Sequence, residues 1–140
     1  MTEAALEHHK TNRAFYDRIS EAYDFIADSS EKPARQAGLK ALAIQPGEKV
    51  LEIGYGTGNE IIDLARLVGP SGTVAGIDVS PGMCQVAQRK IDAAELPKAP
   101  ELAVGDARKL PYPDASFDAA YTSFTLELFP EEDIAAVLAE

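Results

Sequence analysis

In Val50-Leu51-Glu52-Ile53-Gly54-Tyr55-Gly56-Thr57-Gly58, an apolar run leads directly into three alternating glycines. Glycine has no Cβ atom to keep the backbone away from a ligand, so a strand that ends in such a loop and reopens as a helix predicts a cofactor-binding turn. A dinucleotide fingerprint would have another glycine at position 59, but that position is Asn59. The stretch therefore predicts a nucleotide-like ligand and disfavours NAD.

Three more segments downstream have the character of strands. Thr73–Asp78 is apolar and β-branched and ends in a carboxylate, which is placed either to accept both hydroxyls of a ribose or to cap the next turn. The run from Leu102 to Ala107 is a third strand that ends in Gly-Asp-Ala. Residues 110–121 supply a proline-rich turn and a fourth strand.

Two amphipathic helices separate these strands. Apolar residues recur at one helical face within residues 61–68 and again within residues 83–91. Thr57 is positioned to cap the first helix, and Ser80 followed by Pro81 is a common start for the second. Alternating strands and helices at this spacing predict right-handed parallel crossovers and a doubly wound α/β fold.

Glu52 with its three glycines, Asp78, and Gly105-Asp106-Ala107 resemble motifs I to III of the class I S-adenosylmethionine-dependent methyltransferases. Residues 22–26, residues 105–111 and residues 123–127 look most like the ubiquinone and menaquinone biosynthesis branch. The resemblance implies a Rossmann-like sheet with strand order 3-2-1-4 and S-adenosyl-L-methionine as cofactor. It covers nearly all of this chain but about two-thirds of the family fold, so we expect a sheet truncated after the helix that follows strand four.

The resemblance also implies roles for individual residues. Glu52 would anchor the methionine amino group, although it could equally be a buried carboxylate that backbone N–H groups satisfy. Asp106 and the Ala107 N–H would meet the adenine, and Val79 and Met83 would flank it or simply belong to the core. The full cofactor-binding set expected from the resemblance is Tyr23, Glu52, Gly54, Tyr55, Gly56, Gly58, Asp78, Val79, Met83, Asp106, Ala107, Ser123 and Phe124.

The N-terminal part is expected to be helical. Residues 1–44 would form a helical lid, made of one helix from about Asn12 to Asp28 and another from Ser30 to Ala43, and residues 45–140 would form the α/β core of the same domain. In related methyltransferases such helices cover the cofactor, with the counterpart of Tyr23 near its methionine end. Tyr16 and Tyr23 could instead be ordinary amphipathic core residues.

Composition narrows the partners and the location. A formal net charge of −10, with no basic run, argues against nucleic acid, as does the lack of an Asn/Asp-Pro-Pro-aromatic signature after strand four. Cys84 is the single cysteine, no apolar run approaches the roughly twenty residues of a membrane span, and no signal peptide is visible. We therefore expect a cytoplasmic protein without a transmembrane segment. No cluster has the spacing of a metal site.

Three functions remain open from the sequence. The first is methyl transfer to a small-molecule or lipid-like acceptor, for which no catalytic residue is assigned because in-line displacement mainly needs an aligned nucleophile. The second is a module that binds S-adenosylmethionine or S-adenosylhomocysteine without turnover, because the C-terminal part of the family fold is missing. The third is a nicotinamide-dependent oxidoreductase. Strand four would be an exposed edge, so either the chain is a fragment or a second copy or a partner chain completes the sheet.

Overall fold

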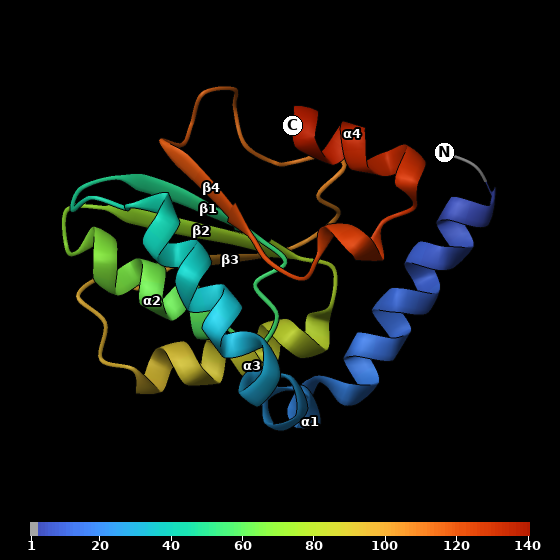
Figure 1. The fold of residues 1–140 in the computed structure, drawn as a ribbon, viewed down its shortest axis with the longest axis horizontal. Helices are drawn as coiled ribbons and strands as arrows, with labels where there is room; N and C mark the ends of the chain where they lie inside the picture. The colour runs from blue at the N-terminus through green and yellow to red at the C-terminus, as the bar shows by residue number, and fades with distance from the viewer. Residues whose placement is uncertain (1–2) are drawn as a thin grey trace.

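The structure, a computed structural model, describes the backbone of residues 3–140 and the side chains of residues 7, 10–20, 22 and 30–140. Its centre is a parallel four-stranded sheet, β3-β2-β1-β4, which confirms the order expected from the sequence (Figure 1). The strands are β1 (Lys49–Ile53), β2 (Thr73–Asp78), β3 (Glu101–Val104) and β4 (Ala119–Thr122). The fold is therefore the expected Rossmann-like α/β class.

β1 is the interior strand on which the site depends. Val50 pairs with Val74 of β2 on one side and with Ala119 of β4 on the other. From Val50 to Ile53 the strand is buried, as expected for a strand covered on both faces of a parallel sheet. Because all four strands are parallel, their carboxyl ends meet at one edge of the sheet.

The helices after the strands are α2 (Asn59–Val68), α3 (Pro81–Ala93), the 3₁₀ turn η1 (Leu126–Leu128) and α4 (Glu131–Ala139). Ser80 caps α3 as expected, because its Oγ accepts the Met83 N–H at 3.1 Å and Pro81 follows it. The expectation that Thr57 caps α2 is wrong. The cap position is Gly58, whose φ of +92° forms the left-handed turn into the helix.

One long helix, α1 (Glu3–Leu42), replaces the two separate N-terminal helices expected from the sequence. Its first part, residues 3–22, and its last part, residues 30–42, run in different directions in Figure 1. We call these the N-terminal arm and the C-terminal arm. Pro33 lies inside the helix, where it removes one hydrogen bond and crowds the preceding turn. The helix continues through Pro33, so the break expected between two N-terminal helices is absent.

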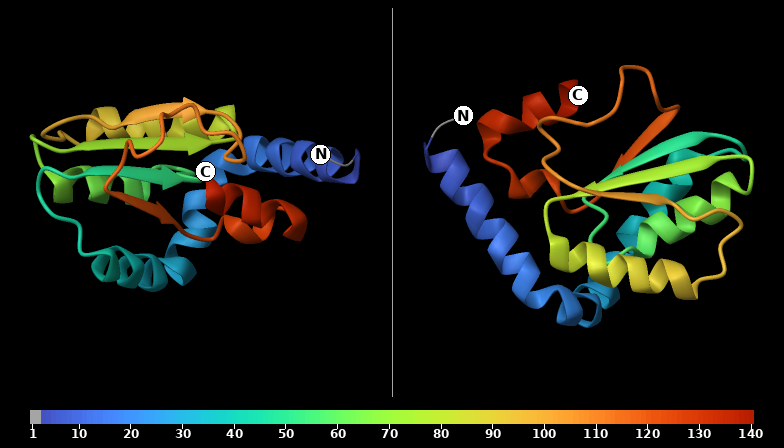
Figure 2. Two further views of the ribbon diagram at one scale, coloured as in Figure 1. Left: turned by 90° about the horizontal axis from the view of Figure 1, so that it is seen from above. Right: turned by 180° about the vertical axis from the view of Figure 1, so that it is seen from behind.

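Two apolar clusters cover the two faces of the sheet. The C-terminal arm, α2 and α3 pack on one face, with Leu39, Ile61 and Ala87 in one cluster. α4 and the segment between β3 and β4 contribute to the other face, where Leu51 and Val137 belong to a second cluster. The N-terminal arm lies beyond the carboxyl ends of the strands (Figure 2). It is therefore positioned to cover whatever binds at that edge.

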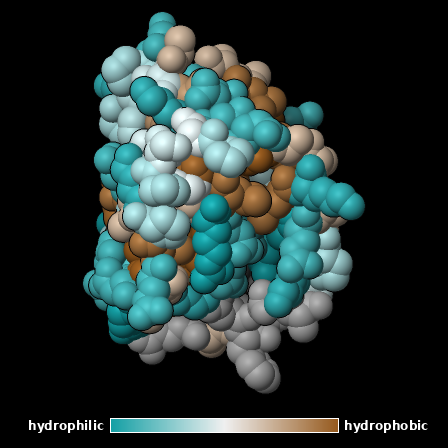
Figure 3. All heavy atoms as spheres, turned by 90° about the vertical axis from the view of Figure 1, so that its left-hand side faces the viewer, coloured by the Kyte–Doolittle hydropathy of each residue, from teal (hydrophilic) through white to brown (hydrophobic). Residues whose placement is uncertain are grey.

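The opposite end of the molecule is mainly hydrophilic. Figure 3 shows this side, which contains the loops that lead into the strands, with apolar side chains visible between hydrophilic ones. Among the described residues, no helix combines the length and the apolar character that a bilayer span requires.

Candidate functional site

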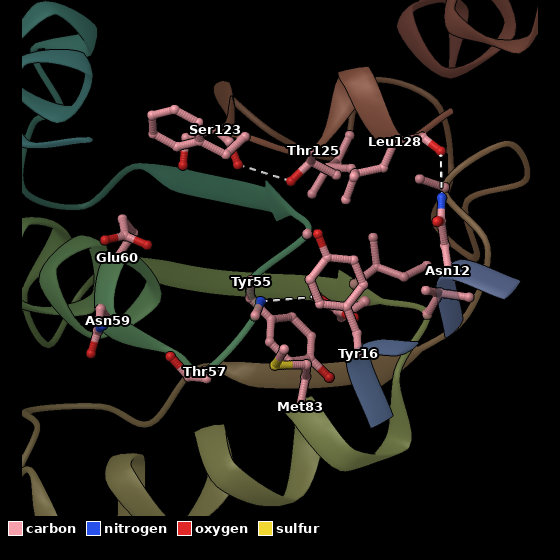
Figure 4. A pocket seen from close by; sticks show the side chains of 18 of the residues that line it. Asn12, Tyr16, Tyr55, Thr57, Asn59, Glu60, Met83, Ser123, Thr125 and Leu128 are labelled. Carbon is pink, nitrogen blue, oxygen red and sulfur yellow. Dashed lines mark hydrogen bonds between the residues drawn. The ribbon is translucent and has the colours of Figure 1, made fainter. Parts of the chain in front are cut away.

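A pocket opens at the carboxyl ends of the strands, beneath the N-terminal arm of α1. Its volume is about 940 Å³, including the part open to solvent. Figure 4 shows that Tyr16 of α1 lies across it, with Met83 on one side and Ser123, Thr125 and Leu128 on the other. The lining residues are Asn12, Tyr16, Glu31, Arg35, Ile53, Gly54, Tyr55, Gly56, Thr57, Asn59, Glu60, Ile77, Asp78, Val79, Met83, Gly105, Ala107, Ser123, Phe124, Thr125, Leu128 and Phe129.

A side chain would meet different surroundings at each of the three glycines of the loop. A Cβ atom on Gly54 would overlap Thr125, and one on Gly58 would lie 2.9 Å from the Cβ of Ala87 in α3. Gly56 is different, because a Cβ atom there would meet no heavy atom within 4 Å. All three have positive φ. Gly56 is therefore the glycine at which the bare backbone faces open space, and it lines the pocket.

Asp78 at the end of β2 ties the glycine loop to the start of α3. Its Oδ2 accepts the Gly56 N–H at 2.9 Å and its Oδ1 accepts the Ser80 N–H at 2.9 Å. Burial raises the pKa of this carboxyl, while the N–H groups of Ser80, Gly56 and Val79 oppose that rise. Asp78 therefore holds the turn into α3, which is one of the two roles considered for it from the sequence. It also lines the pocket, where the other role, accepting from a ribose, remains a prediction.

Glu52 is buried directly behind the glycine loop. Its exposed fraction is 1%, and its Oε2 has no hydrogen-bond partner among the described residues. Burial raises the pKa of Glu52 well above its usual range, the charges of Glu60 and Asp78 raise it further, and Arg35 lowers it. An unsatisfied buried carboxylate oxygen is costly unless a donor reaches it. Glu52 is not among the residues that line the pocket.

The residues expected around adenine separate into two groups. Val79, Met83 and Ala107 line the pocket. Asp106 does not, because its carboxylate turns to Arg108, accepting from Nη2 at 2.6 Å and from Nε at 3.0 Å. Arg108 also donates to Asp133 at the start of α4, at 2.7 Å. In this structure Asp106 therefore joins a strand end to a helix rather than facing the pocket.

The segment after β4 forms the opposite wall. Ser123 and Phe124 line the pocket, and Thr125 Oγ1 donates to the Ser123 carbonyl at 2.9 Å. Phe124 has a φ of +49° and a 40% exposed side chain. A bulky residue in the left-handed region is a backbone outlier of the kind that clusters at functional sites.

Three other residues of the expected set have different positions. Tyr55 contributes to the pocket wall, but its ring is buried and its hydroxyl donates to the Ala103 carbonyl at 3.1 Å. Gly58 is not a lining residue, since it accommodates α3. The side chain of Tyr23 lies outside the described side chains.

Several lining residues belong to α1 and were missing from the expected set. Asn12 and Tyr16 are four positions apart, as are Glu31 and Arg35, and that spacing places each pair on one face of a helix. Arg35 Nε lies 2.7 Å from Glu60 Oε1, and Arg35 Nη1 lies 3.2 Å from Glu31 Oε2. The signal in the sequence that could have identified these lining residues was the i, i+4 spacing of polar residues before the glycine loop.

The charge of the pocket favours a cationic ligand. Three carboxylates, those of Glu31, Glu60 and Asp78, line it, against one guanidinium, that of Arg35. An excess of one charge in a partly enclosed site attracts the opposite charge. Among the described side chains, those of residues 7, 10–20, 22 and 30–140, no group of three or more His, Cys, Asp or Glu could hold a metal ion.

Comparison with known proteins agrees with this geometry. A sequence family described as a methyltransferase domain matches residues 50–140. A demethylmenaquinone methyltransferase from Lactobacillus johnsonii is 36% identical over 122 residues, which are 84% of this chain and 50% of that protein. The demethylmenaquinone methyltransferase of Bacillus mycoides is 36% identical over 120 residues, 83% of this chain and 50% of its own. The chain thus spans about half the length of these curated relatives.

Solved structures include a similar fold. A crystal structure of a SAM-dependent methyltransferase from Aquifex aeolicus superposes with a TM-score of 0.64 at 30% sequence identity. The match covers 74% of this chain and 55% of that one.

Proposed function

The chain belongs to the methyltransferase domain family, and on this premise we propose that its pocket binds S-adenosyl-L-methionine for methyl transfer to a small-molecule or lipid-like acceptor. The cofactor is the one that the family and its structural neighbours indicate. The proposal goes beyond the family in two respects, the class of acceptor and the activity of this chain.

The observation that carries the proposal is the open space above Gly56, next to Asp78. A side chain at position 56 would project into a pocket rather than into protein, so the backbone there is accessible to a ligand. Asp78 holds this glycine by its N–H and lies at the same pocket edge. The residues present therefore suit a nucleoside whose ribose lies at the end of β2.

We assign roles to residues in keeping with this placement. Asp78 would accept from the ribose hydroxyls, and Val79 and Met83 would pack against the adenine, with the Ala107 N–H at its edge. Glu52, with one unpartnered buried oxygen, would receive the methionine ammonium, directly or through water. Asp106 would reach the adenine amino group only after giving up part of its bond to Arg108.

Bound S-adenosylmethionine supplies an activated methyl group on a positively charged sulfur. The pocket residues then have to hold an acceptor in line with it and exclude water, which is the main requirement for such a displacement. Ser123 and Leu128 lie opposite Met83 in Figure 4 and would help to hold that acceptor, together with Phe124, which also lines the pocket. We assign no residue as a catalytic base.

Residues 1–44 would act as the lid of this site and residues 45–140 as its cofactor-binding core. Support for the lid comes from Asn12 and Tyr16, which line the pocket from α1. The named activity of the relatives makes a demethylated quinol-like ring the first acceptor to test. A cytoplasmic location remains a prediction from the sequence.

A binding module without turnover is the second candidate. It is favoured by one observation, that the features of the pocket bear on cofactor binding while no described residue is assigned to the chemical step. β4 also has β1 on one side and no described strand on the other, so its outer edge is available to a second copy or to another chain. Either could supply acceptor contacts.

Isothermal titration tests the cofactor. We expect S-adenosylmethionine and S-adenosylhomocysteine to bind and NAD not to bind. Measurable NAD affinity without S-adenosylmethionine affinity would reject the proposal in favour of an oxidoreductase. For turnover, cofactor with a labelled methyl group is incubated with quinol-like, phenolic and lipid acceptors. Labelled product supports the enzyme, while tight cofactor binding with no product across the panel supports the module.

A further inference from the structure

Two residues of the N-terminal arm, Asn12 and Asp17, form hydrogen bonds on opposite sides of the pocket mouth. Asn12 Nδ2 donates to the Leu128 carbonyl of η1 at 2.8 Å, as the dashed line in Figure 4 shows. On the other side, Asp17 Oδ1 accepts from Ser80 Oγ at 2.6 Å and from the Gly82 N–H at 2.8 Å. Tyr16, which lines the pocket, lies between these two anchors in the sequence.

The contact at Asp17 is closely fitted. Gly82 has no side chain, and a Cβ atom there would lie 3.1 Å from the Asp17 Cα and 2.9 Å from Ser20 Oγ. Ser20 and Ser80 are both buried. This close approach of α1 to α3 brings a carboxylate to the first turn of α3, where N–H groups lack partners within the helix and the helix dipole favours negative charge.

The same contact reaches Asp78 through one residue. Ser80 donates its hydroxyl to Asp17 and its backbone N–H to Asp78 Oδ1. The other oxygen of Asp78 accepts the Gly56 N–H. A continuous hydrogen-bonded series therefore runs from α1 through the start of α3 to the glycine loop.

We propose that Asp17 is a positioning residue that fastens the N-terminal arm over the cofactor pocket and orients the turn that carries Asp78. Its carboxylate is the acceptor that joins the arm to Ser80 and Gly82. Loss of that acceptor frees the arm, removes Tyr16 from the pocket mouth and loosens the Asp78 turn. Insofar as the ligand is S-adenosylmethionine, the proposal rests on the function proposed above.

The test compares Asp17→Ala with Asp17→Asn and with Asp92→Ala. Asparagine keeps an oxygen that can accept from both donors. Asp92 is an exposed aspartate of α3 whose described partner is Gln88, so it controls for loss of a surface carboxylate. Two readouts are needed: the dissociation rate of S-adenosylmethionine from the 140-residue chain, and hydrogen exchange of the unliganded protein at residues 10–20 and at Gly82.

We expect Asp17→Ala to dissociate cofactor about tenfold faster, since two hydrogen bonds to a charged acceptor are lost. Hydrogen-exchange protection should fall at residues 10–20 and at Gly82 and persist in β1 and α2. Asp17→Asn should stay within about twofold of wild type, because the amide oxygen still accepts from Ser80 and Gly82. Asp92→Ala should do so as well, because it leaves Asp17 and its two hydrogen bonds unchanged.

Two results would overturn the proposal: unchanged protection at residues 10–20 in Asp17→Ala, or equal impairment of Asp17→Asn and Asp17→Ala. A protein that binds no S-adenosylmethionine would refute the proposed function separately. In that case the hydrogen-exchange comparison of the unliganded variants still decides whether Asp17 fastens the arm.

Discussion

Thr125 packs against the bare Cα of Gly54, in the space that a Cβ atom would occupy. This contact joins the glycine loop after β1 to the segment after β4, so two walls of the pocket have a fixed separation. The first glycine of the loop is therefore required by protein packing, whereas Gly56 is the glycine that leaves room for a ligand.

Gly54→Ala should destabilise the protein by about 2–3 kcal/mol, since the added methyl group overlaps Thr125 and φ is +75°. Urea unfolding measures the loss. In a Thr125→Gly background the overlap disappears and only the backbone strain remains, so the same change should cost about 1 kcal/mol. Equal costs in both backgrounds would contradict the packing explanation.

Gly56→Ala should leave the protein folded but weaken cofactor binding by about tenfold or more, because its methyl group points into the pocket. Gly69→Ala is the matched control. Gly69 also has a positive φ and open space where a Cβ atom would lie, but it does not line the pocket. Thermal melting measures the stability loss of each variant, and titration calorimetry on the folded proteins should show a binding defect in Gly56→Ala alone. A binding defect in both variants would point to general loosening instead.

Asp78→Ala should weaken S-adenosylmethionine binding by about 1–3 kcal/mol, because it removes the proposed ribose acceptor. It should also lower the melting temperature, since the N–H groups of Gly56 and Ser80 lose their acceptor. Titration calorimetry on the folded variant separates these effects. Wild-type affinity in this variant would exclude the ribose role.

The pH dependence of stability should depend on Glu52. Because its folded pKa is raised above the usual 4.5, the folded protein keeps this proton at a pH where the unfolded chain has lost it. Its contribution is therefore complete below about pH 4.5 and is lost as pH rises through the folded pKa. Melting temperatures from pH 5 to 8 should show Glu52→Gln gaining on wild type as pH rises. The exposed control Glu101→Gln should follow wild type, and a constant offset for Glu52→Gln would contradict the mechanism.

Arg108→Ala should reduce the free energy of unfolding by about 2 kcal/mol, since two charge-assisted hydrogen-bonded pairs are lost. The side chain of Arg108 is 11% exposed and joins Asp106 to Asp133. Arg66, which is 55% exposed and pairs with Asp63, provides the control. Arg66→Ala should cost less than about 0.5 kcal/mol in the same urea titration. Equal losses in the two variants would argue against a structural role for the Arg108 bridges.

The sheet was predictable from the sequence because its signals are local. Apolar runs, the glycines after β1 and the Ser80-Pro81 cap each depend on neighbouring residues. The strand order came from the resemblance to the methyltransferases, and the structure has that order. The single α1 helix was not predicted, because the apolar spacing of residues 12–28 and of residues 30–43 is the same for two helices as for one helix that changes direction.

The site was predictable at its backbone and less so at its side chains. Gly56, Asp78 and Val79 line the pocket because each lies at or just after a strand end, and Met83 does so from the first turn of α3. Asp106 turns to Arg108 instead, which depends on α4 lying nearby. Contacts such as that of Asp17 with Ser80 join positions far apart in the sequence, so no local sequence pattern predicts them.

β1 acquires both of its neighbours only when Ala119–Thr122 has paired with it. During synthesis on a ribosome, that partner emerges long after β1, β2 and the intervening helix. The chain between β1 and β4 loses conformational entropy before their contacts form, and this slows such long-range parallel pairing. Until then one side of a strand that is buried in the folded protein is unpaired, and a chaperone that binds extended apolar segments would meet it in that interval.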